Sequence, residues 1–357
     1  MIPNSCLRLV RQTSVREAPR QMPRFPRDPT RREGATIFVP DFDDVLTRFA
    51  QECGDAAVAA VAARLAAPLR VAVTGRAGVG RTTLARALAR DGRRVAEHTP
   101  DVAVVVVAEA VKPEDVASVA GWRDADVPVV VVGNKADLTG PIPPDALRRY
   151  RSGEHGDVPV ESVVALLAVV SLDDDALGAL QLLAAQPAEL RSANAFLDAA
   201  HPLPRDVRMR LLRTLGLRGV EHSVRALRDG ADPHDLPTLL REVSGFDRVL
   251  DRLDALAAPA RYDRIRAALA ELQGRAAGDD RIAAFLADDD TVLAVMTAAV
   301  DVVQAAGLAV DPGDDAATHL RRAVWWRGYS RGPVSPLHRA CGADIARGSL
   351  RLFERRR

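Results

Sequence analysis

The chain has 357 residues, enough for two domains, and its formal net charge of +1 argues against a protein that binds nucleic acid over much of its surface. The three cysteines, Cys6, Cys53 and Cys341, lie too far apart for a disulfide framework or a cysteine metal site. The first residues lack the pattern of a secretory signal, so we expect a cytoplasmic protein.

Residues 1–35 carry five prolines, eight arginines and only three acidic residues, and they show no apolar periodicity. This composition predicts a disordered, basic leader. Residues 36–68 differ, because apolar side chains recur at helical spacing from Asp43 to Ala66. We expect one helix here, packed on the helical region that ends the chain.

Residues 69–186 alternate between apolar runs and helical patterns. Strands are predicted at 69–74, 102–107, 127–132 and 158–162, and helices at 83–90, 113–122 and from an N-cap at Ser171 to about residue 185. Continuous runs of β-branched residues are typical of parallel strands that are covered on both faces. The predicted fold class is therefore α/β, with a doubly wound, mainly parallel sheet.

Residues 187–357 contain no further strand pattern and predict an all-helical bundle, interrupted at prolines and glycines such as Gly245 and Gly274. The most apolar stretch, 291–310, contains Asp301 and Gln304. An aspartate at the centre of a membrane span costs about 2.5–3.5 kcal/mol. We therefore expect a buried helix of the bundle at 291–310 and not a membrane span.

The strongest motif is Gly75-Arg-Ala-Gly-Val-Gly-Arg-Thr-Thr83, between a predicted strand and a predicted helix. In that position glycines let successive backbone N–H groups turn toward a phosphate, and the helix N-terminus adds partial positive charge. The expected phosphate ligands are Gly75, Gly78, Val79, Gly80, Arg81, Thr82 and Thr83. Thr82 is also placed to coordinate Mg²⁺. A glycine turn without a ligand remains the alternative.

Arg81 stands where such loops usually carry lysine. A lysine ammonium is a compact point charge, whereas the guanidinium of arginine is larger and planar. Nucleotide binding tolerates this exchange more readily than catalysis does.

A second motif, Asn134-Lys135-Ala136-Asp137, follows the third predicted strand. There the Asp137 carboxylate can accept hydrogen bonds from the N1 and 2-amino groups of guanine, which adenine does not offer. The stem of Lys135 would lie along the base, and Asn134 would tie this loop to the phosphate loop. For a further contact to the base we prefer Ser162 over Ser171, which is the expected helix cap.

In this order the two motifs resemble those of P-loop GTPases of the translation-factor class. The run from Leu69 to Arg76, with a helix before it and a helical region after it, is similar to bacterial dynamin-related or Era-like GTPases of the actinobacterial type. The motifs cover residues 69 to about 185, and beyond them the resemblance is architectural. It implies a reduced Ras-like P-loop NTPase domain that binds GTP or GDP with Mg²⁺.

The chain departs from this family where the family hydrolyses GTP. Such GTPases have a switch threonine and an Asp-x-x-Gly sequence, but here only about ten residues separate the first helix from Asp101. His98-Thr-Pro-Asp101 is the one remnant, with His98 for the aspartate and Asp101 for the glycine. We interpret His98 and Asp101 as a degenerate switch and predict slow or absent hydrolysis.

Three interpretations of function remain open. The first is a guanine-nucleotide-binding protein that hydrolyses GTP slowly or not at all and acts as a nucleotide-stabilised scaffold or switch. The second is an active GTPase completed by a partner or a second subunit. The third is a pseudo-GTPase interaction module that binds no nucleotide.

The expected partners are guanine nucleotide and a protein, which includes a second copy of the chain, and nucleic acid is not expected. The run 325–331, Trp-Trp-Arg-Gly-Tyr-Ser-Arg, together with the three terminal arginines, is compatible with peripheral membrane contact. We favour the alternative that the aromatic side chains anchor one helix to the bundle and that the arginines are solvated.

Overall fold

The computed structural model describes residues 41–140 and 158–357, so the predicted leader at 1–35 lies outside the described residues. The strands are β1 (Arg70–Thr74), β2 (Arg94–Val95), β3 (Val102–Val107), β4 (Val129–Asn134) and β5 (Val160–Val163). The helices up to β5 are α1 (Phe42–Cys53), α2 (Ala56–Leu65), α3 (Arg81–Arg90), α4 (Pro113–Asp124) and α5 (Ala136–Thr139). After β5 come α7 (Ala165–Ala168), α8 (Asp174–Ala185), α9 (Ala193–Asp198), α10 (Arg205–Arg228), η2 (Pro233–Asp235), α11 (Leu236–Ser244), α12 (Phe246–Ala276), α13 (Asp280–Ala287), α14 (Asp289–Ala305), α15 (Ala316–Ser330) and α16 (Pro336–Arg356).

The strands form one five-stranded sheet in the order β2-β1-β3-β4-β5, and every neighbouring pair is parallel. Strand β3 shows why both faces are covered. Its even-numbered valines, such as Val104, join one buried cluster, whereas odd-numbered residues such as Val105 join another. Since successive side chains of a strand point to opposite faces, six apolar residues in a row require a layer on each side. The predicted α/β class with a parallel sheet is confirmed.

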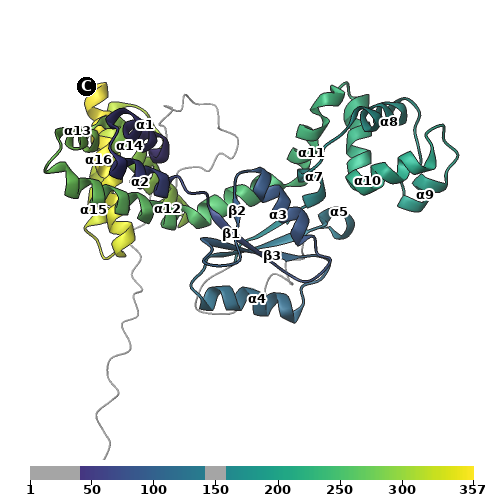
Figure 1. Cartoon of the computed structure of the whole chain (residues 1–357), viewed down its shortest axis with the longest axis horizontal. Helices are drawn as coiled ribbons and strands as arrows, with labels where there is room; N and C mark the ends of the chain where they lie inside the picture. The colour runs from purple at the N-terminus through teal and green to yellow at the C-terminus, as the bar shows by residue number, and fades with distance from the viewer. Residues whose placement is uncertain (1–40, 141–157) are drawn as a thin grey trace, which may run out of the picture. The chain divides into compact units, whose positions relative to one another are not determined.

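The helices that follow β1 and β3 cover opposite faces of this sheet (Figure 1). Helix α3 contributes Leu84 and Leu88 to one face and leads to the edge strand β2. Helix α4 contributes Val119 to the other face and leads to β4 on the opposite side. The strand order therefore reverses between β1 and β3, and ligands of open α/β sheets bind at the carboxyl ends of the strands at such a point.

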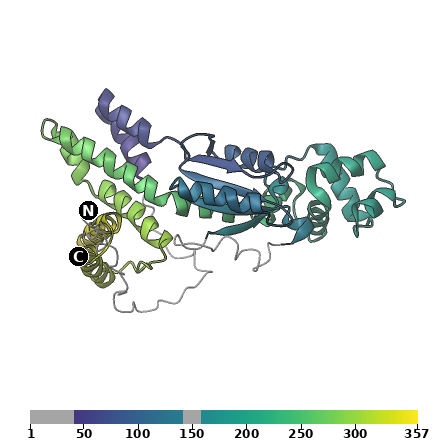
Figure 2. The same ribbon diagram turned by 90° about the horizontal axis from the view of Figure 1, so that it is seen from below.

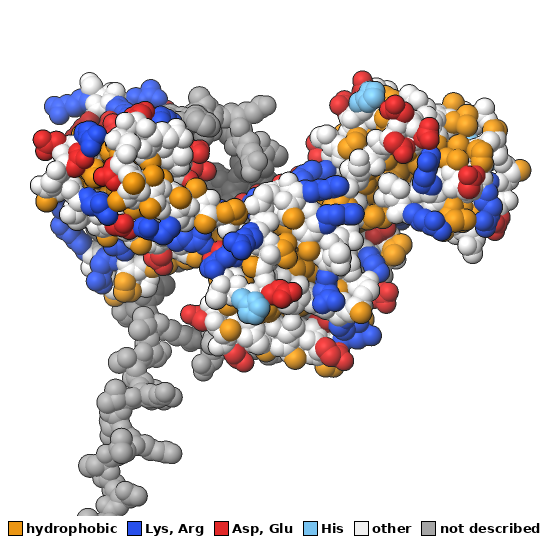
Figure 3. Space-filling view, viewed as in Figure 1, with side chains coloured by type: hydrophobic (Ala, Val, Ile, Leu, Met, Phe, Trp, Pro, Cys, Tyr) orange, Lys and Arg blue, Asp and Glu red, His pale blue; other side chains and the backbone are white. Residues whose placement is uncertain are grey.

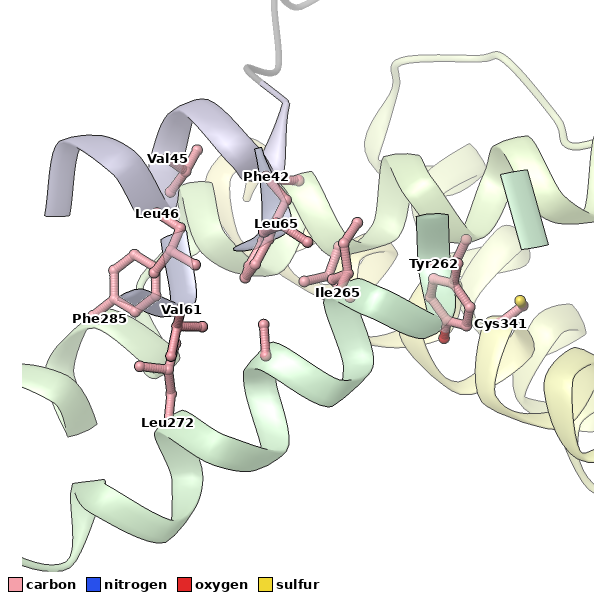
Figure 4. Packing of buried hydrophobic residues seen from close by; sticks show 14 of the residues in the cluster. Phe42, Val45, Leu46, Val61, Leu65, Tyr262, Ile265, Leu272, Phe285 and Cys341 are labelled. Atoms are coloured by element: carbon pink, nitrogen blue, oxygen red, sulfur yellow. The ribbon is translucent and has the colours of Figure 1, made fainter. Parts of the chain in front are cut away.

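The first helical segment is two helices where the sequence pattern predicts one. Gly54 adopts a left-handed conformation (φ 68°) that ends α1, and the side chain of Asp55 caps α2 by accepting from the N–H groups of Ala57 and Val58. Apolar spacing continues across this break, because both helices pack on the same core. That core also takes residues from α12, α13, α14, α15 and α16, among them Tyr262 (Figure 4).

The helices after β5 do not share a single core. Helices α7, α8, α9, α10 and α11 enclose one cluster, which includes Phe196, Leu211 and Leu240. Helices α13 to α16 belong to the cluster that they form with α1 and α2. Each group buries its own apolar residues.

Helix α12 links the sheet to the C-terminal cluster, and its course can be followed in Figures 1 and 2. Residues from Phe246 to Ala257 pack on the sheet, and residues from Ala258 to Leu272 pack with α14 and its neighbours. The helix continues through Pro259 and Gly274 and ends at Ala276. The break expected at Gly274 therefore comes two residues later, since a single glycine costs a helix only about 1 kcal/mol.

Eight of the 17 residues of α14 are buried, so the expected buried helix is present, although it ends at Ala305 and not at residue 310. Within the described ranges no helix combines the length and apolarity that crossing a membrane requires. Acidic and basic side chains are intermingled on the face shown in Figure 3, in keeping with the small net charge.

Candidate functional site

The glycine loop, residues Gly75 to Thr83, leaves the carboxyl end of β1 at the point where the strand order reverses. Three of its glycines have positive φ, at 139° for Gly75, 81° for Gly78 and 94° for Gly80. A Cβ on Gly75 would stand 2.3 Å from the carbonyl oxygen of Val106, so the loop lies directly against β3. Val79 is 3 % exposed and anchors the loop in the core. The loop is thus a fixed backbone turn.

Helix α3 begins inside this loop and buries Leu84 and Leu88 beneath it. Gly80 is the N-cap, and no side chain caps the first N–H groups of the helix. These donors and the helix dipole favour an anion at this end. Within the ranges that the structure describes, neither Arg81 nor Thr82 makes a side-chain hydrogen bond or ion pair, and both are exposed. They are available to a ligand placed at the loop.

Arg76 lies in the glycine loop but is not among the expected phosphate ligands, and its side chain links the loop to the start of α4. Its Nε donates to both carboxylate oxygens of Asp115, at 3.1 and 3.3 Å, and its Nη2 donates to the carbonyl of Ala110. Asp115 is 1 % exposed and also accepts a hydrogen bond from the backbone N–H of Lys112, the N-cap residue of α4. The hydrogen bond to Asp115 raises the pKa of Arg76. An aspartate in the first turn after Pro113 is the sequence signal that points to this partner.

Asn134 joins three loops at this edge of the sheet. It is the last residue of β4 and only 5 % exposed. Its Nδ2 donates to the carbonyl of Val79 at 2.8 Å, and its Oδ1 accepts from the N–H of Ala165 at 2.9 Å. The predicted tie between Asn134 and the glycine loop is confirmed. Gly80 is required beside it, because a Cβ there would come within 2.1 Å of the Asn134 Nδ2.

Lys135 and Asp137 follow at the start of α5. Lys135 has a left-handed backbone (φ 60°), which turns the chain sharply out of β4. Asp137 is half-buried, and its Oδ2 lies 3.6 Å from the position that a Cβ on Gly216 would take. The same position is 4.0 Å from Cδ2 of Leu166 in helix α7. The carboxylate therefore lies beside the α10 backbone at Gly216.

The two serines considered for the base side lie in different surroundings. Ser162 is the residue before the last of β5 and pairs with Gly133, next to Asn134. Ser171 does not cap α8, because Asp173 does so by accepting from the N–H of Ala176 at 2.8 Å. Aspartate and serine are comparable caps, and the helix starts at the later of the two.

His98 and Asp101 are not brought to the glycine loop. After β2 the chain returns to the start of β1, where the N–H of Asp101 donates to the carbonyl of Arg70 at 2.8 Å. The carboxylate of Asp101 accepts from the Arg70 N–H at 2.9 Å and pairs with Arg264 at 2.7 Å. Burial opposes ionisation, but the hydrogen bonds from Arg70 and Arg264 lower the pKa of Asp101 overall. His98 is exposed.

The position of Asp101 explains why the expected switch geometry does not arise. Arg70 is the first residue of β1, whereas the glycine loop follows Thr74 at the other end of the strand. Asp101 thus closes the amino edge of the sheet and does not face a phosphate at the carboxyl edge. We find an ion-paired structural carboxylate where the sequence predicts a remnant of a switch.

The C-terminal aromatic run divides between core and surface. Trp326 is 2 % exposed, whereas Trp325 is 40 % exposed and stacks on Tyr329.

Among the described residues, no cluster of three or more His, Cys, Asp or Glu side chains is placed to hold a metal ion. A divalent ion at the glycine loop would therefore draw on the Thr82 hydroxyl and on the oxygens of a bound ligand.

Neither a protein-family model nor a curated protein matches the chain.

Proposed function

We propose that the chain is a guanine-nucleotide-binding protein with a P-loop fold, which holds GDP or GTP with Mg²⁺ at the carboxyl edge of its sheet and hydrolyses GTP slowly or not at all. One observation carries the proposal. The buried Asn134 side chain bonds to the glycine loop through Val79 and to the start of helix α7 through Ala165. A phosphate cradle and a base-recognition motif are thereby held in one fixed arrangement.

The phosphate half of the proposal rests on the backbone. The N–H groups from Gly78 to Thr83 and the dipole of α3 supply donors and partial charge that no side chain of the described residues caps. Arg81 adds a full positive charge beside them. The Thr82 hydroxyl would coordinate Mg²⁺ together with phosphate oxygens. That ion, when bound, neutralises charge on the phosphates.

The base half of the proposal rests on Asp137. A carboxylate offers only acceptors at neutral pH, and guanine presents two donors, N1–H and the 2-amino group, on one edge. Adenine presents an acceptor at N1, so it would leave the carboxylate facing a lone pair. The exposure of Asp137 is intermediate, which leaves it accessible to a base.

Slow hydrolysis follows from where the chain runs after α3. The segment 91–101 returns through β2 to the amino edge, where Asp101 is held by Arg70 and Arg264. It therefore brings neither a threonine nor a glycine N–H to the γ-phosphate position. The nucleotide would then stabilise the sheet core, which α12 joins to the C-terminal helices. Such a protein acts as a nucleotide-stabilised scaffold or switch.

Release of bound nucleotide tests the proposal. The purified protein is denatured and the supernatant is separated by ion-exchange chromatography, with turnover of added GTP measured in parallel. We expect guanine nucleotide and turnover below about 10⁻⁴ s⁻¹, the order of slow intrinsic GTPases. Adenine nucleotide would contradict the base assignment. Turnover near one per second without a partner would favour an active GTPase, and neither bound nucleotide nor binding of added GDP would favour the nucleotide-free interaction module.

A further inference from the structure

Helix α10 is bent at Gly216, where the backbone has φ 67° and ψ 171°. Essentially only glycine adopts this combination, and residues held in such regions persist because their surroundings fix them. The helix continues on both sides of the bend, from Arg205 to Leu215 and from Leu217 to Arg228. The bend therefore depends on glycine at this position.

The bend lies against the candidate base site. The position of a Cβ on Gly216 is 3.6 Å from Oδ2 of Asp137 and 4.0 Å from Cδ2 of Leu166. Three residues further along, a Cβ on Gly219 would approach Cδ2 of Leu167 to 2.7 Å. The lack of a side chain at both glycines therefore lets the α10 backbone come close to Asp137 of α5 and to Leu167 of α7.

Hydrogen bonds from guanine would place its nitrogen atoms about 2.8–3.0 Å from the carboxylate oxygens of Asp137. A Cβ on Gly216 would stand 3.6 Å from Oδ2, close enough to crowd an atom that is hydrogen-bonded to that oxygen. We infer that the bent backbone at Gly216 forms a wall of the base pocket and makes helix α10 part of guanine recognition. This inference rests on the proposed function.

The same geometry couples the base to one group of helices. Leu211, Leu215 and Val220 of α10 are buried in the cluster shared with α8 and α11. The Oγ of Ser223 donates to the carbonyl of Gly219 at 2.8 Å, which bonds the second half of the helix within itself. A base seated against Gly216 therefore contacts α10 directly and restrains the cluster that α7 to α11 enclose.

Gly216→Ala tests this inference, with Gly230→Ala as its matched control. Gly230 also has positive φ (93°) and lies just past α10, but a Cβ there would meet nothing within 4 Å. Both variants carry backbone strain, and only one adds an atom beside Asp137. Titration calorimetry measures the affinity of wild type and both variants for GDP and for pyrophosphate, which has no base. Hydrogen exchange of α10 is followed with each ligand.

We expect Gly216→Ala to weaken GDP binding at least tenfold, the scale of one misplaced methyl group in a specific pocket, and to leave pyrophosphate binding within about twofold. Gly230→Ala keeps both affinities. In wild type, GDP slows hydrogen exchange near Gly216 and pyrophosphate does not. If wild type binds GDP but the two variants have equal affinities for it, the inference is overturned and the proposed function stands. If wild type binds neither ligand, both fall together.

Discussion

Polar and charged side chains are paired at the amino edge of the parallel sheet, whereas some at the carboxyl edge have no partner among the described residues. At the amino edge, the Asp101 carboxylate forms ion pairs with Arg70 and Arg264. At the carboxyl edge, Asn134 fixes the loops in place, but the donors of α3 are uncapped and Arg81 has no partner among the described residues. Donors that are fixed but unsatisfied favour binding of an anion, whereas a satisfied ion pair only holds a fold together.

The largest expected effect comes from Asn134→Ala. This change leaves the Val79 carbonyl and the Ala165 N–H without their partner in a buried place. Each unsatisfied buried group costs about 1–3 kcal/mol, so we expect the two together to lower the free energy of unfolding by about 2–6 kcal/mol and to abolish GDP binding. Urea denaturation measures it, with Asn194→Ala, an exposed asparagine of α9, as control. Equal stability of the two variants would refute the role of Asn134.

Arg81→Ala is expected to weaken GDP binding without changing stability. It removes one charge-assisted contact, which is worth about 1.5–3 kcal/mol, or about ten- to a hundredfold in affinity. Arg81→Lys should keep or improve affinity, because a compact ammonium fits between phosphates. The control is Arg86→Ala, an exposed arginine further along α3. Calorimetry that finds the same GDP affinity for both alanine variants would remove Arg81 from the site.

Asp101→Asn is expected to lower the stability of the fold and to leave GDP affinity unchanged, the opposite of what we expect for Arg81→Ala. The change weakens the pairs with Arg70 and Arg264, which are partly exposed, so we expect a cost of about 1–2 kcal/mol in the free energy of unfolding. GDP affinity should stay within about twofold. A large loss of affinity without a loss of stability would return Asp101 to the nucleotide site.

The smallest expected effect is the pH dependence of the stability that Asp101 contributes through its two arginine partners. The folded state lowers the pKa of Asp101, so between the folded and unfolded pKa values the unfolded chain binds more protons. The contribution of Asp101 to stability is therefore present above the unfolded value, about 3.9, and is lost as pH falls through the folded one. The stability difference between wild type and Asp101→Asn should shrink below about pH 4. A constant difference from pH 3 to 7 would contradict this.

The sequence predicts most of the sheet because its signals are local. Six buried residues in a row place β3, and Pro113 marks the start of α4 at the predicted residue. The glycine loop and the tie from Asn134 follow from positions relative to those strands. These features need no knowledge of distant contacts.

What the sequence does not predict depends on contacts between distant segments. Asp101 meets Arg264, which lies more than one hundred residues later in the chain. Arg76 finds Asp115 only because β1 and β3 are neighbours in the sheet. The bend at Gly216 brings the α10 backbone beside Asp137 and Leu166, which belong to other elements. In each case the pairing partner comes from another element.

The most direct test of guanine binding is calorimetry of wild type and Asp137→Asn with GDP, ADP and xanthosine diphosphate. Wild type should bind GDP at least a hundredfold more tightly than ADP, because adenine leaves the carboxylate unpaired. Asp137→Asn should prefer xanthosine diphosphate, since its amide donates where the carboxylate accepted. Equal affinity of wild type for GDP and ADP, or an unchanged preference in the variant, would contradict the proposed base recognition.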